Sequence, residues 1–121
     1  MNPKAEEILK RIKRLIKLIV GIVDNFPKNT PAFKIGEQII DAITSVGANF
    51  VEVQTARSKK EFISTMGIVL KEIKETIYWL EIIKELNLTS SKEVDKILLE
   101  AKELAKIFAS IILTSSKKLK N

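Results

Sequence analysis

The sequence contains no cysteine and no histidine, and only four glycines and three prolines occur among its 121 residues. Without cysteine there is neither a disulfide framework nor a thiol nucleophile. Without histidine, an ordinary zinc site or a Ser-His-Asp triad cannot be assembled. The glycines are isolated, so no glycine-rich phosphate loop is formed. These absences argue against an enzyme and predict that the chain uses no metal and no cofactor.

Long apolar runs are also missing. No run approaches the roughly 18 residues that a membrane-spanning helix needs. Charges recur every few residues from Lys4 to Lys17, which is unlike a secretory signal. A cationic first helix lying on an anionic membrane is a weaker alternative, because its apolar face is needed by the core. We therefore expect a cytoplasmic protein with no membrane partner.

The composition that remains is typical of a compact helical protein, with 45% hydrophobic and 30% charged residues. The length fits a single domain over residues 1–121. Apolar residues recur at helical spacing in four segments, and no segment alternates long enough for a strand. The predicted helices cover about 3–24, 32–55, 59–86 and 91–116. Since the connections are short, the fold class is all-α: an antiparallel, up-down-up-down four-helix bundle.

Local signals mark the helix boundaries. Asn2 can cap the first helix, with a proline at the first helical position. Ser58 and Glu61 have the spacing of a capping box at the start of the third helix. Ser90 begins a second such box at the fourth. The polar, basic tail at 114–121 is expected to fray.

The third helix carries apolar residues on two faces. Its expected inner stripe consists of Phe62, Ile63, Met66, Val69, Leu70, Ile73, Ile77 and Leu80. A further set, the second stripe, consists of Ile68, Tyr78, Trp79, Ile82 and Leu86. One stripe is enough to pack a helix into its own bundle, and a monomer would leave the other in water. The second stripe therefore predicts a homo-oligomer, with the chain as its own partner.

Positive charge is concentrated in two places within a chain of net charge +6. One arc of the first helix, opposite its apolar face, holds the basic arc: Lys10, Lys13, Arg14 and Lys17. The C-terminus holds the basic tail: Lys117, Lys118 and Lys120. A ring of copies would repeat these charges and attract RNA or DNA through phosphates, with little sequence preference. The alternative is a solvated surface, because no aromatic residues are interleaved for base stacking.

Two other polar residues are candidates for a functional site. Asn49 and Glu52 lie near the turn between the second and third helices, and a structural hydrogen bond from Asn49 to a neighbouring helix or copy is the favoured interpretation. Gly36 and Gly47 lie on the inner face of the second helix, where a neighbouring helix can come close.

Two pairs of carboxylates sit one helical turn apart, Glu72 with Glu75 and Glu100 with Glu103. Such pairs can hold a metal ion, but di-iron bundles add histidines to inward-facing glutamates. Lysines are interleaved with these four residues, so a solvated, charge-balanced surface explains them better.

Several motifs carry a family resemblance: "SVGAN" at 45–49, "SKKEF" at 58–62 and "LKEIKETIYWLEII" at 70–83. The similarity begins near 26–40 and resumes weakly at 98–118. Through these motifs the chain resembles the four-helix-bundle proteins encoded by intervening sequences in 23S ribosomal RNA genes. The residues that stand where similar family residues stand are Asn49, Glu52, Ser58, Glu61, Phe62, Glu75, Trp79 and Leu80.

The resemblance implies an antiparallel bundle that assembles as a ring-like homopentamer. Relatives serve as accessory proteins to reverse transcriptases in diversity-generating retroelements, where they bind nucleic acid and the polymerase. Between the positions of Glu52 and Ser58, members of the family usually have small residues or glycine. In this chain the corresponding residues 53–57 contain no glycine. A role tied to a glycine-rich turn is therefore not transferred.

Charge and resemblance together favour a non-enzymatic, oligomeric accessory protein that binds RNA or DNA. The alternative is a protein-interaction scaffold, or an accessory subunit of a larger complex, that does not touch nucleic acid.

Overall fold

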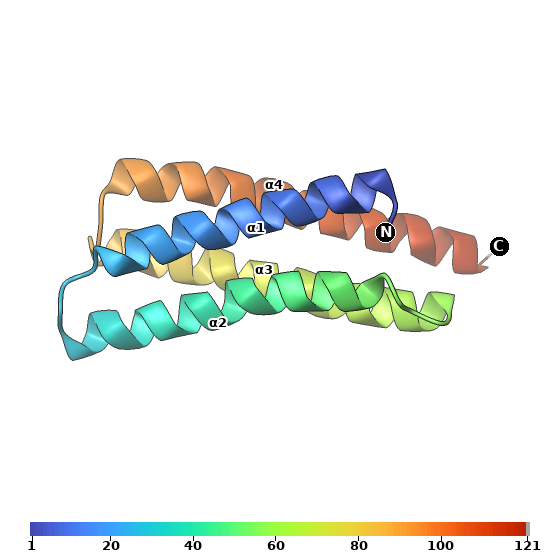
Figure 1. The fold of residues 1–121 in the computed structure, drawn as a ribbon, viewed down its shortest axis with the longest axis horizontal. Helices are drawn as coiled ribbons and strands as arrows, with labels where there is room; N and C mark the ends of the chain where they lie inside the picture. The colour runs from blue at the N-terminus through green and yellow to red at the C-terminus, as the bar shows by residue number, and fades with distance from the viewer. Residues whose placement is uncertain (121) are drawn as a thin grey trace.

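The structure is a computed structural model that describes the backbone of residues 1–120 and the side chains of residues 1–118. Consecutive helices run antiparallel, so both chain ends lie at one end of the bundle (Figure 1). The predicted all-α, up-down four-helix bundle is confirmed. Its helices are α1 (Pro3–Asp24), α2 (Thr30–Val53), α3 (Lys59–Glu85) and α4 (Ser91–Lys120).

Two helix ends differ from the sequence prediction. The start of α2 precedes Pro31, because the Asn29 side chain accepts a hydrogen bond of 3.0 Å from the Ala32 N–H and a proline fits the first turn. The fourth helix was predicted to end at about residue 116, whereas α4 continues to Lys120. Ser115 is buried within this last part of the helix, which shows that the bundle still covers it.

The capping signals at α1 and α3 are confirmed. The Asn2 side chain accepts a 2.8 Å hydrogen bond from the Ala5 N–H. At α3 the Glu61 N–H donates to Ser58 Oγ at 3.1 Å, and the Glu61 carboxylate accepts from the Arg57 N–H at 3.1 Å. The return bond of the capping box is therefore displaced by one residue, onto the residue that precedes the cap.

A left-handed residue ends α3. Asn87 has φ 52°, and its N–H donates to the Lys84 carbonyl at 3.1 Å. The Leu88 N–H donates to the Ile83 carbonyl at 3.1 Å, which completes a Schellman motif. Because two carbonyls of the last turn are satisfied in this way, the chain reverses into α4 within a few residues.

The core is a seam in which buried residues are spaced alternately three and four apart. On α1 the seam consists of Ala5, Ile8, Ile12, Leu15, Ile19 and Ile22, and on α3 of Met66, Val69, Ile73, Thr76, Leu80 and Ile83. The same spacing runs through α2 at Ala32, Gly36, Ile39, Ile43, Val46, Phe50 and Val53, and through α4 at Val94, Ile97, Ala101, Leu104 and Phe108. This heptad pattern is the one that packs antiparallel bundles with small crossing angles.

The predicted inner stripe of α3 was too wide and rotated. Phe62, Ile63, Leu70 and Ile77 are only half-buried, whereas Thr76 and Ile83 are fully buried. Thr76 can occupy the core because its hydroxyl donates to the Glu72 carbonyl at 2.9 Å.

The helix pairs differ in how closely they pack. Contacts are extensive between α2 and α3 and between α3 and α4, and they are least extensive between α1 and α4. The close approach expected at Gly36 is confirmed between α1 and α2, whereas a Cβ at Gly47 would meet α1 at an ordinary van der Waals distance. A Cβ atom at Gly36 would lie 2.9 Å from Val23 Cγ1, and one at Gly47 would lie 3.4 Å from Ile16 Cδ1.

None of the helices in the described part of the chain combines the length and the apolar character that crossing a membrane requires.

A pair of glycine substitutions tests the close approach. We expect Gly21→Ala, with open space around the new methyl group, to raise the free energy of unfolding by about 0.5–1 kcal/mol. Gly36→Ala should instead lower it by about 1–3 kcal/mol through overpacking against Val23. Adding Val23→Ala to Gly36→Ala removes the clash. Denaturant titration measures the free energy of unfolding of all three variants. An equal increase for Gly21→Ala and Gly36→Ala would contradict the close approach.

Candidate nucleic-acid interface

The basic arc lies on the solvent side of α1. Because the seam takes up the opposite side of this helix, the side chains of Lys10, Lys13, Arg14 and Lys17 are all exposed. The ion pairs among the described residues are Arg11 with Glu100 and Lys84 with Asp95. The arc therefore keeps its four positive charges directed at solvent.

An open groove of about 710 Å³ runs along α1 beside the arc, and Glu100 lines it from α4. Lys10, Arg11 and Arg14 line it from α1. Glu6 and Glu7 line the same groove, so the positive field is reduced towards the start of the helix. The uncompensated part of the arc is its second half.

Arg11 is held by a carboxylate and is not part of the arc. Its Nε donates to Glu100 Oε2 at 3.0 Å, and its Nη2 donates to Glu100 Oε1 at 2.6 Å. The hydrogen bond to Glu100 raises the pKa of Arg11 above its ordinary value, although partial burial opposes the rise. This bidentate ion pair joins α1 to α4, the neighbouring helices that pack least extensively. The partners are 89 residues apart, so no sequence pattern indicated the pair.

The basic tail is near the chain's beginning but not near the whole arc. Lys117 and Lys118 are exposed on the last turns of α4, which project past the start of α1 (Figure 1). The side chain of Lys120 lies outside the described residues. Lys17 is about 20 Å further along α1 than Pro3, at 1.5 Å per residue. The arc and the tail therefore form two basic regions.

The second stripe of α3 is divided between solvent and core. Ile68, Tyr78 and Leu86 are exposed, at 44%, 53% and 52%. Ile82 is half-buried. Trp79 is also half-buried and packs against the core, with its ring edge-on to Tyr78 at a centroid distance of 5.0 Å. A change at Trp79 would thus reach the bundle itself, which the helical periodicity alone did not reveal.

The polar residues near the end of α2 have local roles. Asn49 Nδ2 donates to the Ser45 carbonyl at 2.9 Å and to Ser45 Oγ at 3.1 Å. In the described structure the amide N–H group is therefore bonded within its own helix and not to a neighbouring helix, while a bond from Asn49 to an adjacent copy stays a prediction. Glu52 is exposed.

In the described part of the chain, no group of three or more His, Cys, Asp or Glu side chains that could hold a metal ion occurs. Glu72 is half-buried, and this burial raises the pKa of its carboxyl group. Repulsion from Glu75 raises it further, and Lys71 opposes the shift. Glu100, from the other pair, is bound to Arg11.

The sequence profile of the 23S rRNA-intervening sequence protein family matches residues 4–110. The chain belongs to this family. The matched region contains the basic arc and all of α3, and it ends before the basic tail.

A solved structure shows the same fold. It is a crystal structure of a protein with unknown function from the S23 ribosomal protein family, from Bacteroides thetaiotaomicron. The two are 29% identical, with a TM-score of 0.81 over 90% of this chain and 97% of that one. No curated protein matches this chain. The comparisons thus establish family and fold, and they assign no specific function.

The raised pKa of Glu72 makes a prediction about pH. When the pKa of a carboxyl group is higher in the folded state than in the unfolded state, the ionised group destabilises the fold. This lost stability is recovered as pH falls through the folded-state pKa towards the unfolded-state pKa. Glu72→Gln should therefore raise the melting temperature at pH 7, and the gain should shrink as pH falls towards the ordinary value of 4.5. Glu81→Gln, at an exposed position of the same helix, is the control. A gain from Glu72→Gln that is independent of pH would contradict this account.

Proposed function

We propose that the chain is a non-enzymatic, oligomeric accessory protein that binds RNA or DNA through phosphates. The observation that carries the proposal is the basic arc: four exposed positive side chains on one helix, with no ion-pair partner among the described residues. Each lysine or arginine that meets a phosphate releases a condensed counterion, and this gain does not depend on base sequence. Low sequence preference follows from that mechanism.

Self-association is part of the same proposal. Ile68, Tyr78 and Leu86 leave apolar surface in water on a single face of α3. Gly67 lies beside Ile68, and no atom lies within 4 Å of where its Cβ would be, so another helix can approach there closely. A ring of five copies is the assembly that the family resemblance implies. Such a ring would repeat the basic arc around its circumference and strengthen the field that attracts a polyanion.

A protein scaffold is the second candidate function. The exposed part of the second stripe supports it, because aromatic and large aliphatic residues at 44–53% exposure suit contact with a different protein as well as with a second copy. In that case the basic arc would serve only to keep the protein soluble.

Light scattering at micromolar concentration tests the assembly. We expect a mass of several subunits, and Tyr78→Lys combined with Leu86→Lys should reduce it to that of one chain. The control is Leu99→Lys, since Leu99 is 74% exposed and lies on another helix, α4. A monomeric mass for the unmodified chain would contradict the proposal, and a dimer would exclude the ring while retaining the interface.

Fluorescence anisotropy with a labelled RNA hairpin and a labelled DNA duplex tests binding. If about six phosphates are engaged, affinity should fall about 10³-fold between about 50 and 200 mM salt. Reversing Lys13, Arg14 and Lys17 to glutamate should weaken binding to all sequences alike, without changing the mass of the assembly.

The matched control reverses Lys60, Lys92 and Lys96, which are exposed outside the arc and change the net charge equally. If both triple variants bind equally weakly, net charge alone governs binding and the arc is not a site. If the unmodified chain fails to bind at low salt, the scaffold candidate takes precedence.

A further inference from the structure

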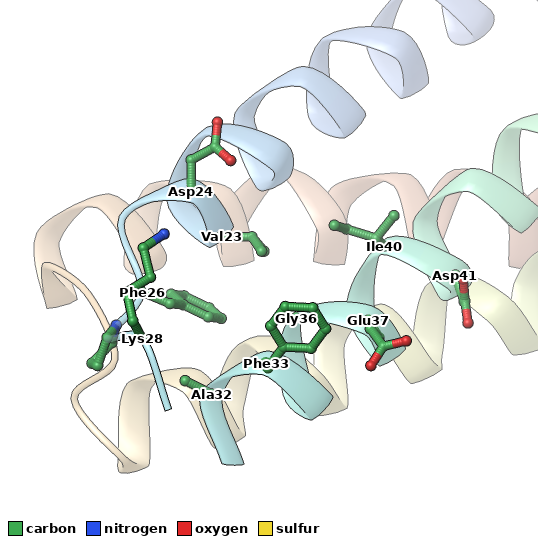
Figure 2. A pocket seen from close by; sticks show the side chains of 11 residues that line it. Val23, Asp24, Phe26, Lys28, Ala32, Phe33, Gly36, Glu37, Ile40 and Asp41 are labelled. Atoms are coloured by element: carbon green, nitrogen blue, oxygen red, sulfur yellow. The ribbon is translucent and has the colours of Figure 1, made fainter. Parts of the chain in front are cut away.

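A cavity of about 320 Å³ lies where α1 ends and α2 begins (Figure 2). Its floor is apolar, formed by Val23, Phe26, Ala32, Gly36 and Ile40. The Phe26 ring lies between the two helices and is 5% exposed. Phe33 stands at the edge and is 72% exposed, more than any other aromatic side chain among the exposed residues of the described structure. The pocket therefore has two aromatic walls, the buried ring of Phe26 and the exposed ring of Phe33.

Local packing keeps this pocket formed. Gly36 lets the Val23 side chain lie against the α2 backbone, where a Cβ would be only 2.9 Å from Val23 Cγ1. Asn29 caps α2 directly after the loop that carries Phe26. With the helices and the loop held at these points, the walls exist before any ligand arrives, as is usual for small-molecule sites.

The charge around the pocket is opposite to that of the molecule. Asp24, Glu37 and Asp41 line it, against the single cation Lys28. The ion pairs of the described residues lie elsewhere, so none of these carboxylates is neutralised by a salt bridge. In a chain of net charge +6, this is a negative region that attracts cations.

We propose that this pocket binds a small organic cation, an ammonium group carried on an apolar or aromatic body. The apolar body would fill the floor against Phe26 and Ile40. Glu37 follows Phe33 by one helical turn on the same face, so the ammonium group meets a carboxylate and an aromatic face together. The volume is at the lower end of the range for ligand pockets, which suits a compact molecule better than an extended peptide.

Three probes of similar shape and different charge separate this chemistry from simple apolar binding. They are 2-phenylethylammonium, 2-phenylethanol and 3-phenylpropanoate, titrated into the full chain while the methyl resonances of Val23 and Ile40 are followed by NMR. We expect saturable shifts with the ammonium, weaker ones with the alcohol and none with the carboxylate. Equal affinity for the ammonium and the alcohol would overturn the proposal.

Exposed side chains allow the site to be changed without disturbing the core. The double variant Glu37→Gln, Asp41→Asn should lower the affinity for the ammonium probe at least about fivefold, because two nearby negative charges are removed. The same variant should leave the affinity for the alcohol unchanged, and Phe33→Ala should lower the affinity for both probes. Lys28→Gln should raise the affinity for the ammonium probe. Glu52→Gln, an exposed acid of the same helix outside the pocket, is the control.

Two further results would overturn the proposal. The first is unchanged ammonium affinity in the Glu37→Gln, Asp41→Asn variant, whose folding circular dichroism verifies. The second is a change in the mass of the assembly on Phe33→Ala, which would mean that another copy of the chain covers the pocket. Neither result depends on whether the basic arc binds nucleic acid.

Discussion

The whole bundle depends on one repeating constraint, the alternation of three and four residues between buried side chains. All four helices keep this spacing, so each presents a narrow apolar line to the common core. Because the line is narrow, many apolar residues at other positions are covered only in part. Ile68, Tyr78 and Leu86 on α3 and Phe33 on α2 are left exposed for this reason. The surfaces from which function is inferred are thus a direct result of how the core is built.

The two neighbours of α1 are held by different means. Towards α2 the contact is close and apolar, and at Gly36 it leaves no room for a Cβ beside Val23. Towards α4 packing is least extensive, and the bidentate pair of Arg11 and Glu100 joins the helices instead. The groove beside the basic arc includes Glu100 of this ion pair, and the pocket near the α1–α2 loop includes Val23 and Gly36 of the close apolar contact.

Much of the fold could be predicted from sequence because its signals are local. Asn2, Ser58 and Glu61 form the expected caps, and apolar periodicity identified all four helices. The face of α3 was harder, because a threonine competes with adjacent apolar residues and only the intrahelical bond of Thr76 makes its burial favourable. The exposure of the basic arc followed from its position opposite the seam. The Arg11–Glu100 pair and the pocket depend on residues brought together only by the tertiary fold, and no spacing rule could indicate them.

The shared location of the chain ends has a consequence for engineering. Both termini lie at one end of the bundle, and the turns that join α1 to α2 and α3 to α4 lie at the other (Figure 1). A domain fused to either terminus would therefore extend from the same pole and leave the opposite pole sterically free. If copies stand side by side in the same direction, every fusion would be displayed on one rim. The molecule is in this sense a one-sided display platform.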